Sequence, residues 1–346
     1  MANPIRVLVV DDSAFVRKVV AKMLSRSSNI LVVGSARDGE DALEMAERLQ
    51  PDVITLDLVM PRMNGVEFLR KQNERRRIPV VICSIAHQSG AMALDALEAG
   101  AVDFIQKPTA LATDLVYEIA DELIAKVEAA ALSMPFSVHE APAKPAPAAR
   151  AQPRRELRAD IVVLGISTGG PQALRYLIPQ LPANFPVPVA MVLHMPVGYT
   201  AMFAERLNAV SHLEVREAKE DDVLAPGVVW LAPAGEHLTF KRADNGLIRA
   251  HLDLRPADTQ HRPAVDVLFR SAADVFGSRV LGVVMTGMGS DGLLGAAHIK
   301  AKGGTVATEA QSSCIVYGMP RAVVEASLSD RSATLDEMAQ AITELI

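Results

Sequence analysis

Short apolar runs alternate with amphipathic segments through the first 130 residues, and this alternation constrains the fold more than any other feature of the chain. Each run has the length of one buried strand, and each amphipathic segment has the period of a helix. Repeated strand–helix units predict a parallel, doubly wound α/β sheet. The predicted strands are Ile5–Val10, Leu31–Ser35, Val53–Leu58, Pro79–Ser84 and Val102–Ile105, and the predicted helices lie near 14–26, 39–49, 64–74, 90–99 and 113–130.

A segment rich in proline and alanine interrupts this pattern. Residues 134–153 hold five prolines and show little periodicity, so they cannot build a core and are typical of a semi-extended linker. We therefore expect a domain at 1–130, a linker at 131–158 and a second domain at 159–346. A length of 346 residues with 50% hydrophobic residues suits two globular cores.

Three apolar runs of the second domain are each followed by a polar residue that can take part in catalysis. Ser167 follows a run that starts at Ile161, His194 follows Pro188–Leu193, and Asp291 closes the glycine-rich turn after Val280–Met285. The carboxyl ends of parallel strands meet at one edge of an α/β sheet, which favours a Ser–His–Asp triad there.

Each of these three residues also has a simpler interpretation when it is taken alone. Ser167 could cap a helix, His194 could bond a backbone carbonyl, and Asp291 could cap the helix that begins near Gly292. Their joint placement favours nucleophilic catalysis over the three separate structural roles.

The ends of the first domain's strands carry carboxylates and a lysine. Asp11 and Asp12 follow the first strand, Asp57 ends the third, and Lys107 follows the fifth. Three ionised carboxylates at one edge require a hard divalent cation such as Mg²⁺. With the lysine, they predict a phosphoryl-acceptor site. The simpler alternative is that the two N-terminal aspartates cap a helix and the lysine is a surface charge.

Four segments of the first domain resemble the receiver domain of two-component response regulators, and the resemblance extends over residues 4–126. This resemblance implies a five-stranded flavodoxin-like domain in which Asp57 takes a phosphoryl group from a histidine kinase. It also implies that Mg²⁺ is held by Asp11, Asp12 and Asp57, that Ser84 and Phe104 form the conformational switch beside Lys107, and that a cis peptide precedes Pro108. The matching positions are Asp11–Asp12, Asp57–Gly65, Ser84 and Lys107–Pro108.

The second domain resembles the effector half of the chemotaxis protein-glutamate methylesterase family. The matching segments are Gly165–Pro171, Leu193–Pro196, His261–Phe269, Thr286–Gly292 and Tyr317–Pro320. The resemblance implies a doubly wound, mostly parallel α/β esterase domain that needs no cofactor. Its substrate is a glutamate γ-methyl ester on methyl-accepting chemoreceptors, and methanol is released; some members also deamidate glutamine.

The same resemblance assigns roles to individual residues. Ser167 is the nucleophile, His194 the general base and Asp291 the residue that orients the imidazole. The backbone N–H of Met288 is assigned to the oxyanion. The residues expected to line the substrate groove are Thr168, His261 and Arg262.

Other classes of protein fit the sequence less well. A net charge of −6 argues against a DNA-binding effector. The turn at Gly165–Gly170 lacks the G-x-G-x-x-G spacing of a dinucleotide-binding module. No apolar run is long enough for a membrane span, and Cys83 and Cys314 are expected as buried thiols, so we expect a cytoplasmic protein without membrane insertion. The histidines expected at the surface are His87, His139, His212, His237, His251 and His298.

Overall fold

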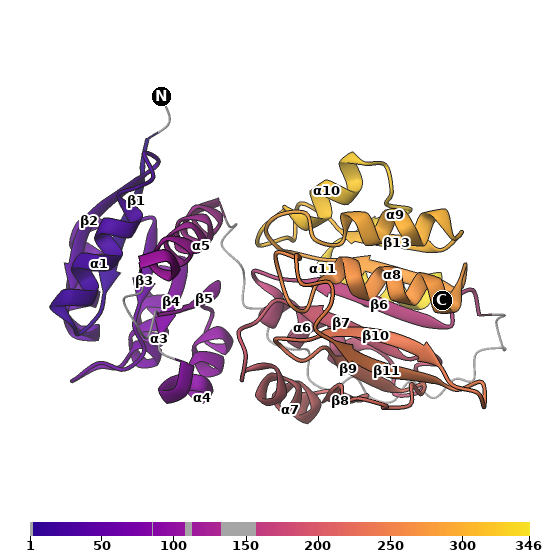
Figure 1. Cartoon of the computed structure of the whole chain (residues 1–346). Helices are drawn as coiled ribbons and strands as arrows, with labels where there is room; N and C mark the ends of the chain where they lie inside the picture. Colours follow the sequence, from indigo (N-terminus) through magenta and orange to yellow (C-terminus); the bar gives the residue numbers. More distant parts are fainter. Residues whose placement is uncertain (1–2, 85, 108–112, 133–156) are drawn as a thin grey trace. The chain divides into compact units, whose positions relative to one another are not determined.

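The computed structural model describes residues 3–84, 86–107, 113–132 and 157–346. The chain divides into two compact units, Met1–Val138 and His139–Ile346, and each is considered by itself (Figure 1). Most of the expected linker at 131–158 lies outside the described residues, so the expected domain borders remain predictions. Within the described ranges, none of the helices has the length and apolar character needed to cross a membrane.

The N-terminal unit is a five-stranded parallel sheet with the strand order β2-β1-β3-β4-β5. Helices α1 and α5 pack together on one face, and α2, α3 and α4 form a row on the other. The strand order reverses between β1 and β3, which is where sheets of this kind place their sites. The elements are β1 Ile5–Val10, α1 Ala14–Leu24, β2 Ile30–Ala36, α2 Gly39–Leu49, β3 Val53–Leu56, α3 Gly65–Arg75, β4 Val80–Ser84, α4 Ala86–Glu98, β5 Asp103–Gln106 and α5 Thr113–Leu132.

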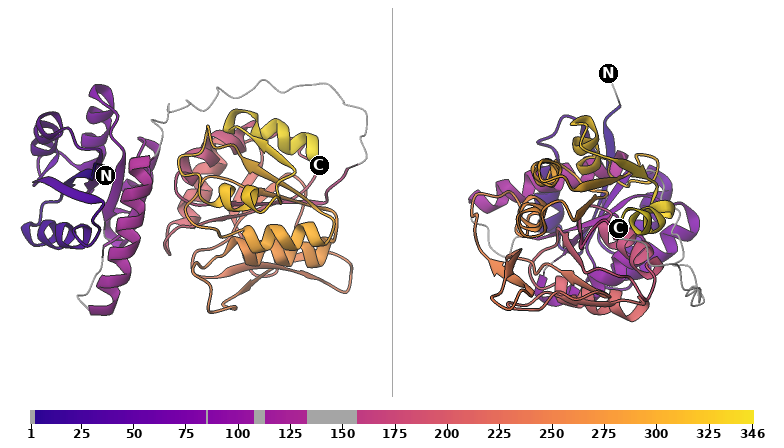
Figure 2. Two further views of the ribbon diagram at one scale, coloured as in Figure 1. Left: turned by 90° about the horizontal axis from the view of Figure 1, so that it is seen from above. Right: turned by 90° about the vertical axis from the view of Figure 1, so that its right-hand side faces the viewer.

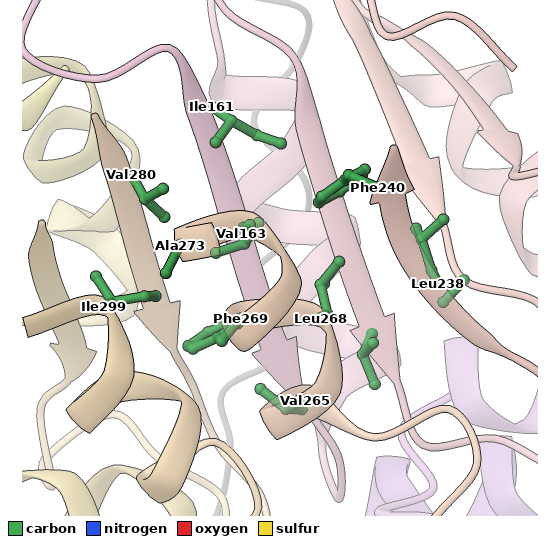
Figure 3. Close-up of a cluster of buried hydrophobic side chains, with 14 of the residues drawn as sticks. Ile161, Val163, Leu238, Phe240, Val265, Leu268, Phe269, Ala273, Val280 and Ile299 are labelled. Atoms are coloured by element: carbon green, nitrogen blue, oxygen red, sulfur yellow. The ribbon is translucent and has the colours of Figure 1, made fainter. Parts of the chain in front are cut away.

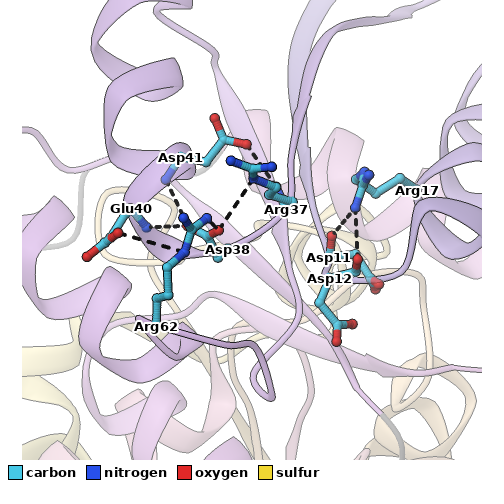
Figure 4. Close-up of polar contacts among 8 residues, drawn as sticks. All are labelled: Asp11, Asp12, Arg17, Arg37, Asp38, Glu40, Asp41 and Arg62. Carbon is cyan, nitrogen blue, oxygen red and sulfur yellow. Dashed lines mark hydrogen bonds and ion pairs between the residues drawn. The ribbon is translucent and has the colours of Figure 1, made fainter.

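Polar side chains at the helix N-termini set where the helices of this unit begin. The Ser13 hydroxyl accepts the Val16 N–H at 3.4 Å, so Ser13 caps α1 and the two preceding aspartates do not. Asp38 accepts the N–H groups of Glu40 and Asp41, each at 3.0 Å, at the start of α2 (Figure 4). These caps satisfy backbone donors that the first helical turn leaves unpaired.

The C-terminal unit contains a seven-stranded parallel sheet with the order β14-β13-β12-β6-β7-β9-β8. Figure 2 shows the ribbon of the chain in two further views. The first strand of this unit, β6, lies in the middle of the sheet, and the strand order reverses between β6 and β12. The elements are β6 Ile161–Ile166, α6 Gly170–Leu177, η1 Ile178–Gln180, β7 Val189–Leu193, α7 Thr200–Val210, β8 Glu214–Glu217, β9 Val228–Leu231, β10 His237–Arg242, β11 Ile248–Asp253, α8 Val265–Phe276, β12 Val280–Val284, α9 Leu293–Ala301, β13 Thr305–Glu309, α10 Met319–Glu325, β14 Arg331–Ala333 and α11 Leu335–Leu345.

Helix α8 fixes the core of this unit on one face of the sheet. Its buried Val265, Leu268 and Phe269 lie in one cluster with Ile161 and Val163 of β6 (Figure 3). The antiparallel hairpin β10–β11 packs against the same helix. Burying each large apolar side chain stabilises the fold by roughly 1.5–3 kcal/mol. The packing therefore fixes the N-terminus of α8 at the edge where β6, β7 and β12 end.

Both expectations of fold class are confirmed: each unit is α/β with a parallel sheet. Cys83 and Cys314 are buried free thiols, as expected from the sequence.

Candidate active site

Ser167 lies in the tight turn between β6 and α6. Gly169 has a φ of 78° and occupies the N-cap position of α6, so Ser167 does not cap this helix. The Gly170 N–H donates to the Ser167 carbonyl at 2.7 Å and closes the turn. Ser167 is half-buried, while its neighbours on both sides are buried. The turn therefore presents one hydroxyl at the carboxyl end of a central strand.

His194 leaves the neighbouring strand at the same level. Ile166 of β6 is in register with Leu193 of β7, and the His194 N–H donates to the Ile166 carbonyl at 3.2 Å. Its Nε2 lies 2.9 Å from Oδ2 of Asp291. Its Nδ1 is buried and has no hydrogen-bond partner within the described part of the chain. Because a carboxylate only accepts, Nε2 donates to Asp291, and in the neutral ring Nδ1 is the nitrogen that can accept a proton.

Asp291 accepts two backbone hydrogen bonds besides the contact with His194. Its Oδ2 accepts the Val265 N–H at 2.8 Å, and its Oδ1 accepts the Asp266 N–H at 2.9 Å. Burial acts to raise the pKa of Asp291, but these bonds and the His194 contact outweigh it and hold the pKa below its usual value. Asp291 therefore caps a helix, but this helix is α8, whereas Gly292 occupies the N-cap of α9.

Asp266, in the first turn of α8, caps the other helix, α9. Its Oδ1 accepts the Gly292 N–H at 2.9 Å and the Gly295 N–H at 2.7 Å, at the start of α9. Burial, together with the nearby charge of Asp291, raises the pKa of Asp266. Asp291 thus caps α8, Asp266 caps α9, and these bonds fix the position of Asp291 beside Nε2 of His194.

The turn after β12 lies against the Ser167 turn. The Ser167 N–H donates to the Thr286 carbonyl at 3.0 Å. A Cβ on Gly287 would lie 2.8 Å from the Ser167 Cβ, so only glycine allows this approach. The backbone N–H of Met288 makes no hydrogen bond to the described residues, and this residue is half-buried. It is available as a donor near the serine.

The three residues expected to bind substrate have different surroundings. His261 stacks on the His194 ring, with 4.1 Å between the centroids. It also lines a cavity of about 610 Å³ together with Asp291 and Leu294. Thr168 is buried, and its carbonyl accepts the Thr286 hydroxyl at 3.0 Å. Arg262 donates to the Ala257 carbonyl at 3.3 Å. Of the three proposed catalytic residues only Asp291 lines this cavity, and Thr168 and Arg262 do not line it either.

The expectation that His237 is a surface residue is wrong. Its side chain is fully buried; Nδ1 accepts the Ala264 N–H at 3.1 Å, and Nε2 lies 3.1 Å from the Pro256 carbonyl. Burial lowers the pKa of His237, so the neutral ring ties β10 to the chain that leads into α8. His212, His251 and His298 are partly exposed, while the side chains of His87 and His139 lie outside the described residues.

The N-terminal unit gathers its acidic residues at the β1–β3 edge. Carboxylate oxygens of Asp11, Asp12 and Asp57 lie within 4.8 Å of one another. The Lys107 Nζ lies 2.5 Å from Asp11 Oδ2 and 2.7 Å from Asp57 Oδ2. Arg17 holds the acidic loop by donating to the Asp11 carbonyl at 2.7 Å and the Asp12 carbonyl at 3.1 Å (Figure 4).

Burial and charge compete at this acidic edge. Burial raises the pKa of Asp57 in spite of the Lys107 charge beside it. Burial acts to lower the pKa of Lys107, but the attraction of Asp57 and Asp11 raises it overall. Lys107 is therefore a cation at neutral pH. Its burial and its ion pairs with Asp11 and Asp57 argue against the interpretation as a surface charge. Ser84 and Phe104 are buried, and the expected cis peptide before Pro108 lies outside the described residues.

Fold and sites together define a class of protein: a response regulator whose effector unit carries a serine-hydrolase arrangement. Comparisons with known proteins agree with this class. Residues 7–119 match the model of the response regulator receiver domain, and residues 162–342 match that of the CheB methylesterase family. The chain belongs to the CheB methylesterase family.

Relatives match along the whole chain. A Myxococcus xanthus protein named protein-glutamate methylesterase/protein-glutamine glutaminase 5 is 52% identical over 342 residues, which cover 98% of this chain and 97% of the relative. A Bacillus subtilis protein named protein-glutamate methylesterase/protein-glutamine glutaminase is 41% identical, with coverages of 99% and 98%. The crystal structure of the Thermotoga maritima CheB methylesterase catalytic domain is 41% identical, with a TM-score of 0.53; the match covers 54% of this chain and 99% of that one.

Proposed function

We propose that this protein hydrolyses glutamate γ-methyl esters on methyl-accepting chemoreceptors, under the control of its receiver domain, and deamidates glutamine at the same site. The names of its full-length relatives support this substrate class. The observation that carries the proposal is the placement of His194. Its Nε2 contacts Asp291 at 2.9 Å, and its backbone is hydrogen-bonded to the residue before Ser167.

We infer the following chemistry for this arrangement. His194 Nδ1 takes the proton of the Ser167 hydroxyl as its oxygen attacks the ester carbonyl, and Asp291 stabilises the imidazolium that forms. The Met288 N–H donates to the tetrahedral oxyanion, and a donor of this kind typically lowers the barrier by about 3 kcal/mol. The imidazolium then protonates the departing methoxide, so methanol leaves and an acyl-enzyme remains.

The second half of the reaction repeats these roles. His194 takes a proton from water, which attacks the acyl-enzyme and releases the glutamate carboxylate and free Ser167. With a glutamine side chain the same steps release ammonia in place of methanol. His261 borders the cavity beside Asp291, which supports its role in holding substrate. Thr168 follows Ser167 in the chain and Arg262 follows His261, and we propose the same role for these two residues.

Phosphorylation at Asp57 by a histidine kinase is the control that we propose for this activity. The clustered oxygens of Asp11, Asp12 and Asp57 fit a Mg²⁺ ion, which prefers hard oxygen ligands. When bound, this ion neutralises charge on the phosphoryl group. Lys107 already contacts two of the carboxylates and would pair with a phosphoryl oxygen. Ser84, whose carbonyl accepts the Lys107 N–H at 2.8 Å, and Phe104 would report the change.

A serine-directed fluorophosphonate tests the assignment of the nucleophile. We expect mass spectrometry to find one adduct, on Ser167, and the His194→Ala variant to react at least a hundredfold more slowly. An adduct on another residue, or equal labelling of the two proteins, would contradict the proposed site.

A further inference from the structure

Glu309 is a buried carboxylate for which the proposed reaction has no use. It ends β13, next to β12 in the sheet, and its side chain is 0% exposed. Among the residues that the structure describes, no lysine or arginine forms an ion pair with it, and burial raises its pKa to about 7. A buried ionisable group without a cation is costly, so a residue of this kind requires an explanation.

The contacts of Glu309 lead to the catalytic turn. Its Oε2 accepts the backbone N–H of Thr286 at 2.9 Å, and its Oε1 accepts the Ser313 hydroxyl at 3.0 Å. Thr286 is the first residue of the turn that carries Gly287 and Met288. Glu309 thus holds the turn at its point of attachment to the strand.

Thr286 also contacts the turn that carries Ser167. Its carbonyl accepts the Ser167 N–H at 3.0 Å, and its hydroxyl donates to the Thr168 carbonyl at 3.0 Å. That hydroxyl also accepts the Val316 N–H at 3.0 Å. A shift of Thr286 would therefore move Ser167 and the proposed Met288 donor relative to each other, and catalysis is sensitive to such small displacements.

We propose that Glu309 is a positioning residue for ester hydrolysis: it acts through Thr286 to hold the oxyanion turn against Ser167. This inference rests on the proposed function.

The hydrogen bond to Thr286 does not depend on the charge of Glu309. Ser313 accepts the Leu335 N–H at 2.9 Å, and its hydroxyl also lies 3.3 Å from the Ala310 carbonyl. A protonated Glu309 can therefore donate to Ser313, whose own proton turns to Ala310, while the other carboxyl oxygen still accepts from Thr286. Glutamine can make the same pair of bonds, but methionine, which is similar in size, offers no oxygen acceptor.

Comparing the glutamine and methionine variants therefore separates a positioning role of Glu309 from a role in core packing alone. We would measure methanol release from membranes that contain methylated chemoreceptors, using full-length protein saturated with a phosphodonor. Glu309→Gln should keep kcat within about threefold of wild type. Glu309→Met should lower kcat about tenfold to a hundredfold while KM stays within twofold. Glu214→Met, at an exposed glutamate of the edge strand β8, is the matched control and should leave both constants unchanged.

Three results would overturn the inference. One is a Glu309→Met protein with more than half the wild-type kcat, and another is an equal loss in the glutamine variant. If circular dichroism shows that Glu309→Met does not fold, Glu309→Leu replaces it, because leucine also fills the site without offering the Thr286 N–H an acceptor. A Glu309→Leu protein with more than half the wild-type kcat is the third result. Ser167→Ala separates the two hypotheses: if it retains turnover, the proposed function itself fails. If it is inactive while Glu309→Met is fully active, only the positioning role fails.

Discussion

Replacing Asp291 with asparagine tests the link between catalysis and helix capping. Three donors converge on its carboxylate: His194 Nε2–H and the Val265 N–H at Oδ2, and the Asp266 N–H at Oδ1. An asparagine side chain has nearly the same shape but only one acceptor oxygen. In either orientation its NH₂ group must face at least one of these donors.

The size of the effect follows from this count of donors. With the amide oxygen at the Oδ2 position, the Asp266 N–H loses its partner; the reverse orientation leaves His194 and Val265 without one. One unpaired buried donor costs about 1–3 kcal/mol, so the free energy of unfolding should fall by that amount. The neutral amide also cannot stabilise the imidazolium, and kcat should fall by about 10³–10⁴.

Both quantities can be measured on one protein preparation. Urea unfolding gives the stability and methanol release gives kcat, and Asp266→Asn is the comparison. The two N–H groups that Asp266 caps, those of Gly292 and Gly295, both donate to Oδ1. An asparagine can supply this one oxygen, so the free energy of unfolding of this variant should fall by less than about 1 kcal/mol. The reasoning is refuted if Asp291→Asn keeps a third of the wild-type kcat, or if it is as stable as the wild type.

Three further predictions concern other parts of the molecule. Ser167→Ala and His194→Ala should each abolish methanol release, and the double variant should be no slower than either, because the residues act as one unit; additive losses would contradict this. Burial raises the pKa of Glu309 from 4.5 to about 7, so as pH rises Glu309 loses its proton in the unfolded chain before it does in the folded protein. The free energy of unfolding should therefore fall by up to about 3 kcal/mol between pH 4.5 and 7. Urea unfolding across this range should show a flatter profile for Glu309→Gln, and parallel profiles would contradict the assignment. Deleting residues 1–150 should raise basal methanol release and remove its response to a phosphodonor; an unchanged basal rate would favour recruitment to the receptor as the means of control.

Local pattern was enough to predict the parallel sheets, because each buried strand is a short apolar run with a polar residue at its end. The hairpin β10–β11 was not predicted, although its turn contains Asn245–Gly246, a strong hairpin signal between two apolar-alternating segments. Helix α4 begins at Ala86, four residues before the segment expected from periodicity.

Contacts between distant segments could not be predicted in this way. The capping of α8 by Asp291 joins residues about 26 positions apart, and no local motif encodes it. His237 and Glu309 are polar residues at strand ends, where most polar side chains are solvated. Their burial depends on segments that fold over them, such as the chain from Pro256 to Ala264 in the case of His237.

Methanol release from methylated chemoreceptor membranes is the most direct test of the central claim. The full-length protein should release methanol, a phosphodonor with Mg²⁺ should accelerate the release, and Asp57→Asn should remove that acceleration without abolishing the basal rate. Ser167→Ala should release none under either condition. Methanol release by Ser167→Ala at the wild-type rate, or none by the phosphorylated wild-type protein, would contradict the account.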